Sequence, residues 1–146
     1  MSTIPTTGFT PARLVRTPVF WGLVFGVANV LLPIGFWWLD LSTSHALIIT
    51  LIAAVYIGFA VADGRPIVIA VEATVASTFV LVAAIAVTET AWLLVIAYFA
   101  HGCKDLWQHR THFVRNTRWW PPFCAAVDWL VAAALAVEIA AVVNFR

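Results

Sequence analysis

Apolar residues dominate this chain in five long runs that are separated by short polar breaks. The runs are Val19–Leu39, Ala46–Ala62, Ile67–Thr88, Ala91–Trp107 and Pro122–Val143. A helix needs about 20 mainly apolar residues to cross a bilayer, within a range of roughly 17–25. The pattern therefore predicts five transmembrane helices, with one longer connector between the fourth helix and the fifth.

The fourth run is the least apolar of the five. It is apolar from Ala91 to Ala100, which is too short to span a bilayer, and it then continues through His101 and Asp105. Such a helix reaches the far side only if these two groups face protein or water rather than lipid. The alternative is a re-entrant segment within a four-helix arrangement.

Composition assigns the chain to the membrane rather than to water. Its 146 residues are 63% hydrophobic and 10% charged, whereas soluble domains are roughly 45–50% apolar and about 25% charged. We predict an all-α integral membrane protein with an N-terminal segment over residues 1–18 and one transmembrane domain over residues 19–146. The net charge of +1 and the lack of a basic run give no indication of a nucleic-acid partner.

Basic residues are distributed unevenly between the two ends of the predicted helices. Short loops that carry Lys and Arg stay in the cytoplasm. With five spans, the N-terminal side of the bundle holds seven basic residues, and the other side holds Arg146. The seven are Arg13, Arg16, Arg65, Lys104, Arg110, Arg115 and Arg118. We therefore expect a multi-pass protein of the cell membrane with its N-terminus in the cytoplasm and its C-terminus outside.

Polar residues inside the apolar runs follow a repeated spacing. Two tyrosines each precede an aspartate by seven residues, and two prolines each precede an acid by six. The pairs are Tyr56 with Asp63, Tyr98 with Asp105, Pro66 with Glu72, and Pro122 with Asp128. The spacing predicts two repeated helical hairpins, formed by helices two and three and by helices four and five, added to helix one. Coincidence is the alternative.

Two carboxylates lie about two turns inside predicted membrane helices. A charged side chain at the centre of such a helix costs roughly 2.5–3.5 kcal/mol on insertion scales, and these residues usually mark a functional path. Glu72 and Asp128 are the two acids. The structural alternative is an interhelical ion pair, for example with Arg65 or Lys104.

These observations predict a polar pocket in the cytoplasmic half of the bundle. The candidate catalytic residues are Glu72, Asp128, Asp105, His101 and Asp63, and the candidate substrate-binding residues are Tyr56, Tyr98, Trp107, Trp129 and Asn29. Buried carboxylic acids that stay protonated serve as general acids. We expect acid–base chemistry, namely isomerisation, cyclisation or hydrolysis, on a lipid-like or isoprenoid-like molecule, with no cofactor.

Two other functions are compatible with the same residues. His101, Asp105, His109 and His112 lie on one face of the fourth helix. Imidazole and carboxylate groups bind transition metals, so a metal held by His101, Asp105 and His109, or a haem, is the second hypothesis. A proton-coupled transport unit or an accessory subunit is the third, and a homo-oligomer would suit either.

Overall fold

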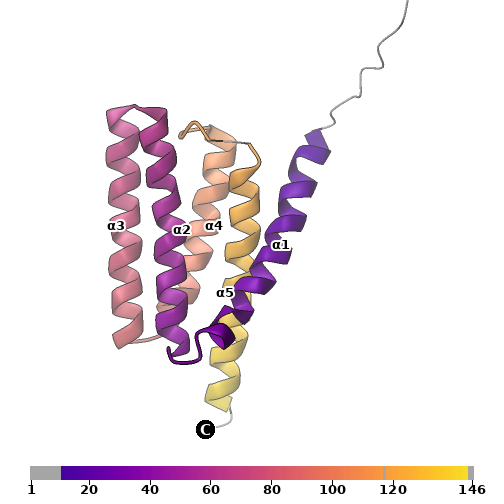
Figure 1. The fold of residues 1–146 in the computed structure, drawn as a ribbon, viewed down its shortest axis with the longest axis vertical. Helices are drawn as coiled ribbons and strands as arrows, with labels where there is room; N and C mark the ends of the chain where they lie inside the picture. Colours follow the sequence, from indigo (N-terminus) through magenta and orange to yellow (C-terminus); the bar gives the residue numbers. More distant parts are fainter. Residues whose placement is uncertain (1–10, 117, 145–146) are drawn as a thin grey trace, which may run out of the picture.

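The computed structural model describes residues 11–116 and 118–144, with side chains from residue 16 to residue 141. The described part consists of five helices and contains no strand. They are α1 (Pro11–Gly35), α2 (Leu41–Asp63), α3 (Pro66–Thr88), α4 (Trp92–Thr111) and α5 (Trp120–Asn144). They form a bundle in which α1 lies obliquely against α5 (Figure 1). The predicted all-α helical bundle is confirmed.

Each of the five apolar runs is a helix, but several predicted ends were wrong. α1 begins at Pro11 and not at Val19, because proline suits the first turn of a helix. α2 begins at Leu41 rather than at Ala46. The Asp40 carboxylate caps it by accepting hydrogen bonds from the backbone N–H and the hydroxyl of Thr43. These bonds also lower the pKa of Asp40. α4 continues four residues past Trp107.

The fourth helix is the central element of the bundle. α4 contacts α2, α3 and α5, whereas α1 packs mainly on α5 and barely touches α2. It is one continuous helix of 20 residues, about 30 Å long at about 1.5 Å per residue. The re-entrant alternative is therefore not seen.

Four of these helices are long and apolar enough to cross a membrane. They are Arg16–Gly35, Leu41–Asp63, Pro66–Thr88 and Trp120–Ala141. α4 is not among them, because it carries polar residues that the neighbouring helices bury. Large apolar side chains such as Leu81, Ile96 and Val137 point outward and are more than 60% exposed. Lipid on the outside explains an exterior this apolar.

Close approach of helix backbones depends on glycine. Gly22 and Gly26 are four residues apart on α1, the small-xxx-small spacing that lets membrane helices approach closely. A Cβ atom on Gly22 would collide with the carbonyl oxygen of Phe123 in α5. A Cβ atom on Gly102 would collide with the Trp129 ring, so α4 also approaches α5 closely.

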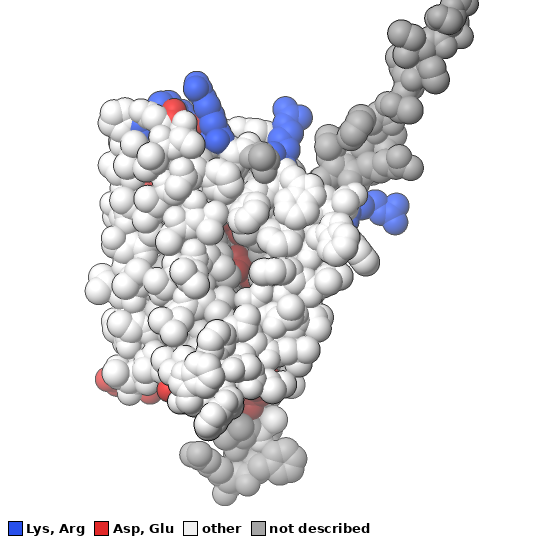
Figure 2. Space-filling view, in the orientation of Figure 1, with Lys and Arg blue, Asp and Glu red and all other residues white. Residues whose placement is uncertain are grey.

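Charged side chains gather at the two ends of the bundle. The start of α1, the α2–α3 turn and the α4–α5 connection share one end, and the α1–α2 and α3–α4 connections share the other (Figure 1). Lys and Arg side chains cluster at the first end, and Asp and Glu line the second (Figure 2). This segregation keeps most of the charge out of the apolar middle.

The contact between α1 and α5 gives a test of the fold. We predict that Gly22→Ala lowers thermal stability in detergent, because the new methyl group pushes against backbone and overpacking costs about 1–3 kcal/mol. Gly58→Ala is the matched control, since nothing lies within 4 Å of a Cβ atom there. Removing that mid-helix glycine should stabilise by roughly 0.5–1 kcal/mol. Equal melting temperatures for the two variants would contradict the proposed close packing.

Candidate functional site

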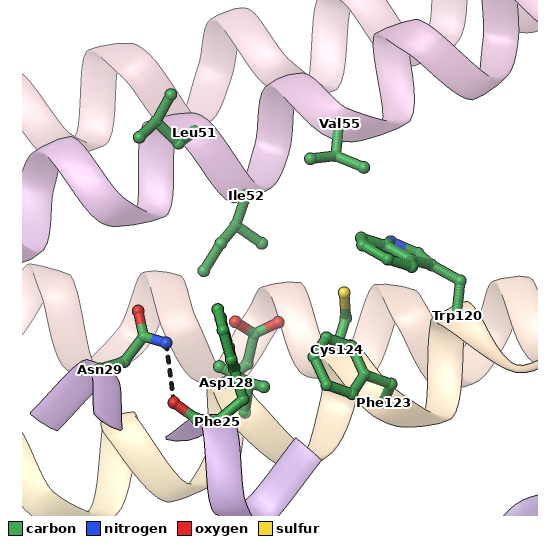
Figure 3. A pocket seen from close by; sticks show the side chains of 10 residues that line it. Phe25, Asn29, Leu51, Ile52, Val55, Trp120, Phe123, Cys124 and Asp128 are labelled. Atoms are coloured by element: carbon green, nitrogen blue, oxygen red, sulfur yellow. Dashed lines mark hydrogen bonds between the residues drawn. The ribbon is translucent and has the colours of Figure 1, made fainter. Parts of the chain in front are cut away.

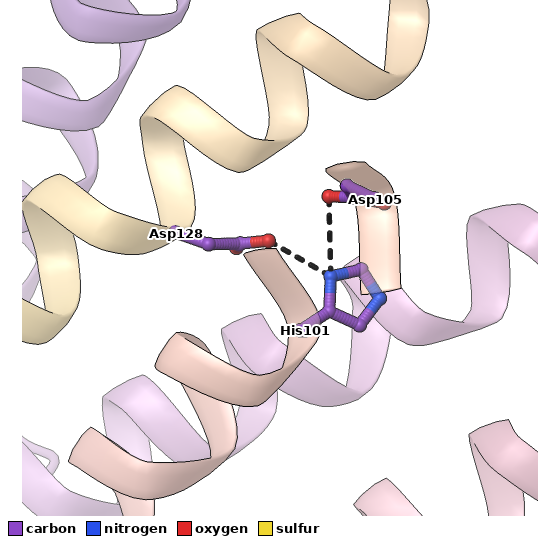
Figure 4. Close-up of side chains that lie close together, drawn as sticks. All are labelled: His101, Asp105 and Asp128. Atoms are coloured by element: carbon purple, nitrogen blue, oxygen red, sulfur yellow. Dashed lines mark hydrogen bonds and ion pairs between the residues drawn. The ribbon is translucent and has the colours of Figure 1, made fainter. Parts of the chain in front are cut away.

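Three buried side chains meet at the centre of the bundle. His101 and Asp105 lie one turn apart on α4, and Asp128 faces them from α5 (Figure 4). The His101 Nδ1 atom is 2.8 Å from the Asp128 Oδ2 atom and 3.5 Å from the Asp105 Oδ2 atom. All three side chains are fully shielded from solvent. We call these three residues the central triad.

Aromatic rings hold the imidazole of His101 in place. Tyr56 of α2 and Phe79 of α3 contact it edge to face, with ring centroids 5.9 and 5.0 Å away. Since Nδ1 is turned toward the two acids, Nε2 points away from them (Figure 4). Nε2 is buried and has no hydrogen-bond partner among the described residues. The ring is therefore oriented by one nitrogen and leaves the other free.

The central triad is rich in negative charge. It combines two carboxyl groups with one imidazole, so one negative charge remains even when His101 is protonated and both acids are ionised. No described arginine is buried beside the central triad to balance this charge. Their side chains are all exposed; they are Arg16, Arg65, Arg110, Arg115 and Arg118. An unbalanced charge in a dry interior is costly. An additional proton or a bound cation would remove that cost.

Glu72 belongs to a neighbouring polar cluster and does not touch the central triad. Its carboxylate binds the Lys104 Nζ atom at 2.7 Å and accepts a hydrogen bond of 2.6 Å from the Gln108 Nε2 atom. The ammonium group also lies 3.7 Å from the centroid of the Tyr56 ring, a cation–π contact. The ion-pair alternative for Glu72 is confirmed with Lys104. Counting Lys104 as a cytoplasmic loop charge was wrong, because the chain buries it.

An apolar pocket of about 330 Å³ leads to Asp128 from the side of the bundle. It opens between α1, α2 and α5, where the backbones of α2 and α5 make no contact. Its lining residues are Phe25, Asn29, Leu51, Ile52, Val55, Trp120, Phe123, Cys124, Val127 and Asp128 (Figure 3). The Asp128 Oδ1 atom is buried and lacks a hydrogen-bond partner in the described part. Acidic atoms are also visible in a hollow halfway along this face (Figure 2).

Asp63 lies far from the centre, at the last residue of α2. Its carboxylate binds the Arg65 side chain through two contacts of 2.5 and 2.8 Å and accepts a hydrogen bond of 2.9 Å from the Arg115 backbone. Arg65 donates in turn to the Phe113 carbonyl at 2.6 Å. The hydrogen bond to Asp63 raises the pKa of the Arg65 guanidinium. Asp63 therefore joins the α2–α3 turn to the loop after α4.

The two proposed hairpins are not equivalent at their acids. Asp63 ends its helix, whereas Asp105 is buried six residues before the end of α4. Glu72 and Asp128 both face the interior, but Glu72 pairs with Lys104 and Asp128 with His101. The spacing of these residues is repeated, and their environments differ.

The remaining histidines of the predicted stripe do not reach the central triad. The three residues whose ligand atoms lie within 4.8 Å of one another are His101, Asp105 and Asp128. His109 is only partly buried and is not in this group. His112 ends α4 in a left-handed conformation (φ 52°) and is exposed. The group of side chains that could hold a metal therefore contains Asp128 and not His109.

The predicted substrate-binding residues divide into two groups. Tyr56 contacts His101, and Asn29 lines the pocket, where its amide donates to the Phe25 carbonyl at 2.9 Å. The others lie elsewhere. Tyr98 donates to the backbone of His45, Trp107 packs on Phe113, and Trp129 donates to the Phe99 carbonyl. Trp107 and Trp129 are more than a third exposed.

Sequence reasoning missed several residues around the site. Gln108 lies seven residues after His101 on the same face of α4, so the helical spacing could have identified it. Phe79 and Cys124 sit in runs of apolar residues, and no local signal separates them from their neighbours. His45 directly precedes Ala46, where the second predicted run begins, but it lies buried within α2.

Comparisons with protein-family models, curated proteins and solved structures find no match for this chain.

The position of Asp63 gives a prediction that separates it from the central triad. We expect Asp63→Ala to speed hydrogen exchange of the Arg115 amide, because that amide loses its acceptor. Exchange at the amides around His101 should stay unchanged. Asp40→Ala is a useful control, since it also removes a carboxylate that accepts a backbone hydrogen bond but lies at the other end of the bundle. Altered protection at the central triad in Asp63→Ala would contradict a purely structural role.

Proposed function

We propose that this chain is a membrane-embedded enzyme in which the central triad performs acid–base chemistry on an apolar molecule. One observation carries the proposal: Asp128 both contacts His101 and lines the pocket at the side of the bundle. A molecule dissolved in lipid therefore has a path to an acid that is itself held by an imidazole.

The arrangement supports a simple division of roles. The Asp128 carboxylate, turned toward the pocket, takes a proton from the substrate and returns one at a later step. The His101 Nδ1–H group stabilises the carboxylate before and after these steps, and the second carboxylate, Asp105, favours a protonated imidazole. A histidine oriented by a carboxylate is a common acid–base device. Isomerisation, cyclisation and hydrolysis are the reaction types that such a proton transfer serves.

The distribution of charge supports an orientation as well. The exposed arginines of the described part gather at the end of the bundle that holds the α2–α3 turn and the α4–α5 connection (Figure 2). We propose that this end faces the cytoplasm, following the bias of basic loops. The opposite end then faces outward in a cell membrane.

Isotope incorporation tests the proposed enzyme without a known substrate. The purified protein is incubated with lipids extracted from its native membrane, in heavy water and in water that carries heavy oxygen. Protonation at carbon introduces deuterium, and hydrolysis introduces heavy oxygen, both of which mass spectrometry detects. We expect label in a particular lipid, and a loss of about 10²–10⁴-fold in Asp128→Asn, the effect of removing one acid–base group.

Controls separate chemistry from folding in this experiment. His101→Gln should lose incorporation as well, whereas Glu138→Gln, which alters another carboxyl group on α5, should keep it. Unreduced labelling by Asp128→Asn would overturn the assigned role. The absence of label in every extract would contradict an enzyme and favour the transport or accessory function.

A second candidate function is supported by the ligand geometry. The three donor atoms of His101, Asp105 and Asp128 lie within 4.8 Å of one another, and one imidazole with two carboxylates is a suitable donor set for a divalent metal. The cation would also balance the negative charge of the central triad. A metal bound there would polarise an oxygen atom of a ligand.

Elemental analysis distinguishes the two candidates. If the metal function holds, the purified protein contains a stoichiometric transition metal, and Asp128→Asn lowers the content. His109→Ala should leave it unchanged, because His109 lies outside the ligand group. Metal below one-tenth stoichiometry after growth in metal-supplemented medium would contradict this function. A haem would be recognised by its absorption spectrum in the same sample.

A further inference from the structure

We infer that the pocket takes a single long apolar chain that ends in a hydrogen-bond donor, a hydroxyl or an amine, with this head at Asp128. The inference rests on the proposed site and names its ligand class. It excludes the more common anionic lipids, whose carboxylate or phosphate heads would meet the acids of the central triad.

The pocket at Asp128 continues into a second apolar cavity. This cavity, of about 430 Å³, shares Phe25, Asn29, Leu51 and Ile52 with the first. The two form one groove between α1 and α2 that runs along α2 from Val55 to Ser44. The eleven residue-to-residue steps from Ser44 to Val55 correspond to about 16 Å of helix at about 1.5 Å each. A groove this long suits an extended chain rather than a compact fused ring system.

The head is selected by charge and hydrogen bonding. Asp128 lies partway along the groove, level with Ile52 (Figure 3), fully buried, and its Oδ1 atom lacks a partner among the described residues. Its other oxygen is held by His101, and Asp105 lies beyond. A donor head satisfies the free oxygen. An anionic head would add a negative charge near two carboxylates, which repel it strongly in a medium of low dielectric constant.

The tail contributes little to selectivity. In a membrane the alternative environment of the chain is lipid, which is as apolar as the groove, so burial in the groove brings no hydrophobic gain. Discrimination between lipids must therefore come from the head. The contacts at Asp128 decide which ligand is bound.

A series of ligands with one tail and four heads tests the inference. The probe is hexadecanol that carries a photoactivatable diazirine in the middle of its chain, added to the protein in nanodiscs. The competitors are unmodified hexadecanol, hexadecylamine, palmitate and hexadecyl phosphate at equal amounts in the bilayer. We expect photolabel on peptides that contain Phe25 or Leu51. The alcohol and the amine should compete at least about tenfold better than the two anions.

Variants locate the two parts of the ligand. Ile52→Trp should remove the photolabel by filling the groove, because Ile52 lines both cavities and is partly buried. Leu81→Trp, on the outward face of α3, should not. Asp128→Asn should abolish the discrimination between hexadecylamine and palmitate. If this variant does not fold, the head series on the unaltered protein still decides the question.

The outcomes separate this inference from the proposed function. Equal competition by all four heads would overturn it, as would photolabel that survives Ile52→Trp. A preference for palmitate or hexadecyl phosphate would also overturn it and would indicate a bound cation at the central triad. Selective binding of the alcohol and the amine without any isotope incorporation would keep the ligand class and reject the enzyme.

Discussion

The enclosure of α4 is the constraint on which this structure depends. One helix carries His101, Lys104, Asp105 and Gln108 among apolar residues, and none of these groups is tolerated in contact with lipid. α2, α3 and α5 surround the helix and supply the partners. Glu72 of α3 pairs with the ammonium and the amide, and Asp128 of α5 pairs with the imidazole. The bundle is thus arranged around the buried polar residues of α4.

The two buried polar clusters differ in whether their charges are balanced. The cluster of Glu72 is balanced, because one carboxylate meets one ammonium and a neutral amide. The central triad is not balanced, and it retains a free nitrogen on His101 and a free oxygen on Asp128. Groups that only stabilise a fold are normally satisfied. Gln108 Oε1 in the cluster of Glu72 also lacks a hydrogen-bond partner among the described residues. The uncompensated negative charge, together with the free oxygen of Asp128 at the pocket, therefore distinguishes the central triad as the place where a ligand completes the site.

The sequence predicted the fold better than it predicted the site. Apolar runs specify helices in a membrane because length and hydropathy are decisive there, so all five helices could be found. The acids were harder to place. Depth along a helix is readable from the sequence, and three of the predicted candidates, His101, Asp105 and Asp128, do lie close together in the structure. The partner across the bundle is not readable, which is why Asp63 was grouped with them although a surface arginine holds it. His109 was misjudged for the same reason, because a shared helical face does not tell how far that face stays enclosed.

The pocket that leads to the central triad exists because some helices pack closely and others do not. Gly22 and Gly26 let α1 lie directly on α5, so α1 is held by that helix and not by α2. α4 holds α2 and α5 from the opposite side, and the backbones of α2 and α5 do not meet. The pocket opens at Asp128 because the glycine contact holds α1 against α5, which leaves a gap between α1 and α2. The same arrangement therefore buries the polar residues and leaves a path to them from lipid. α2, α3 and α5 cover the polar face of α4, and α1 covers only part of the gap between α2 and α5.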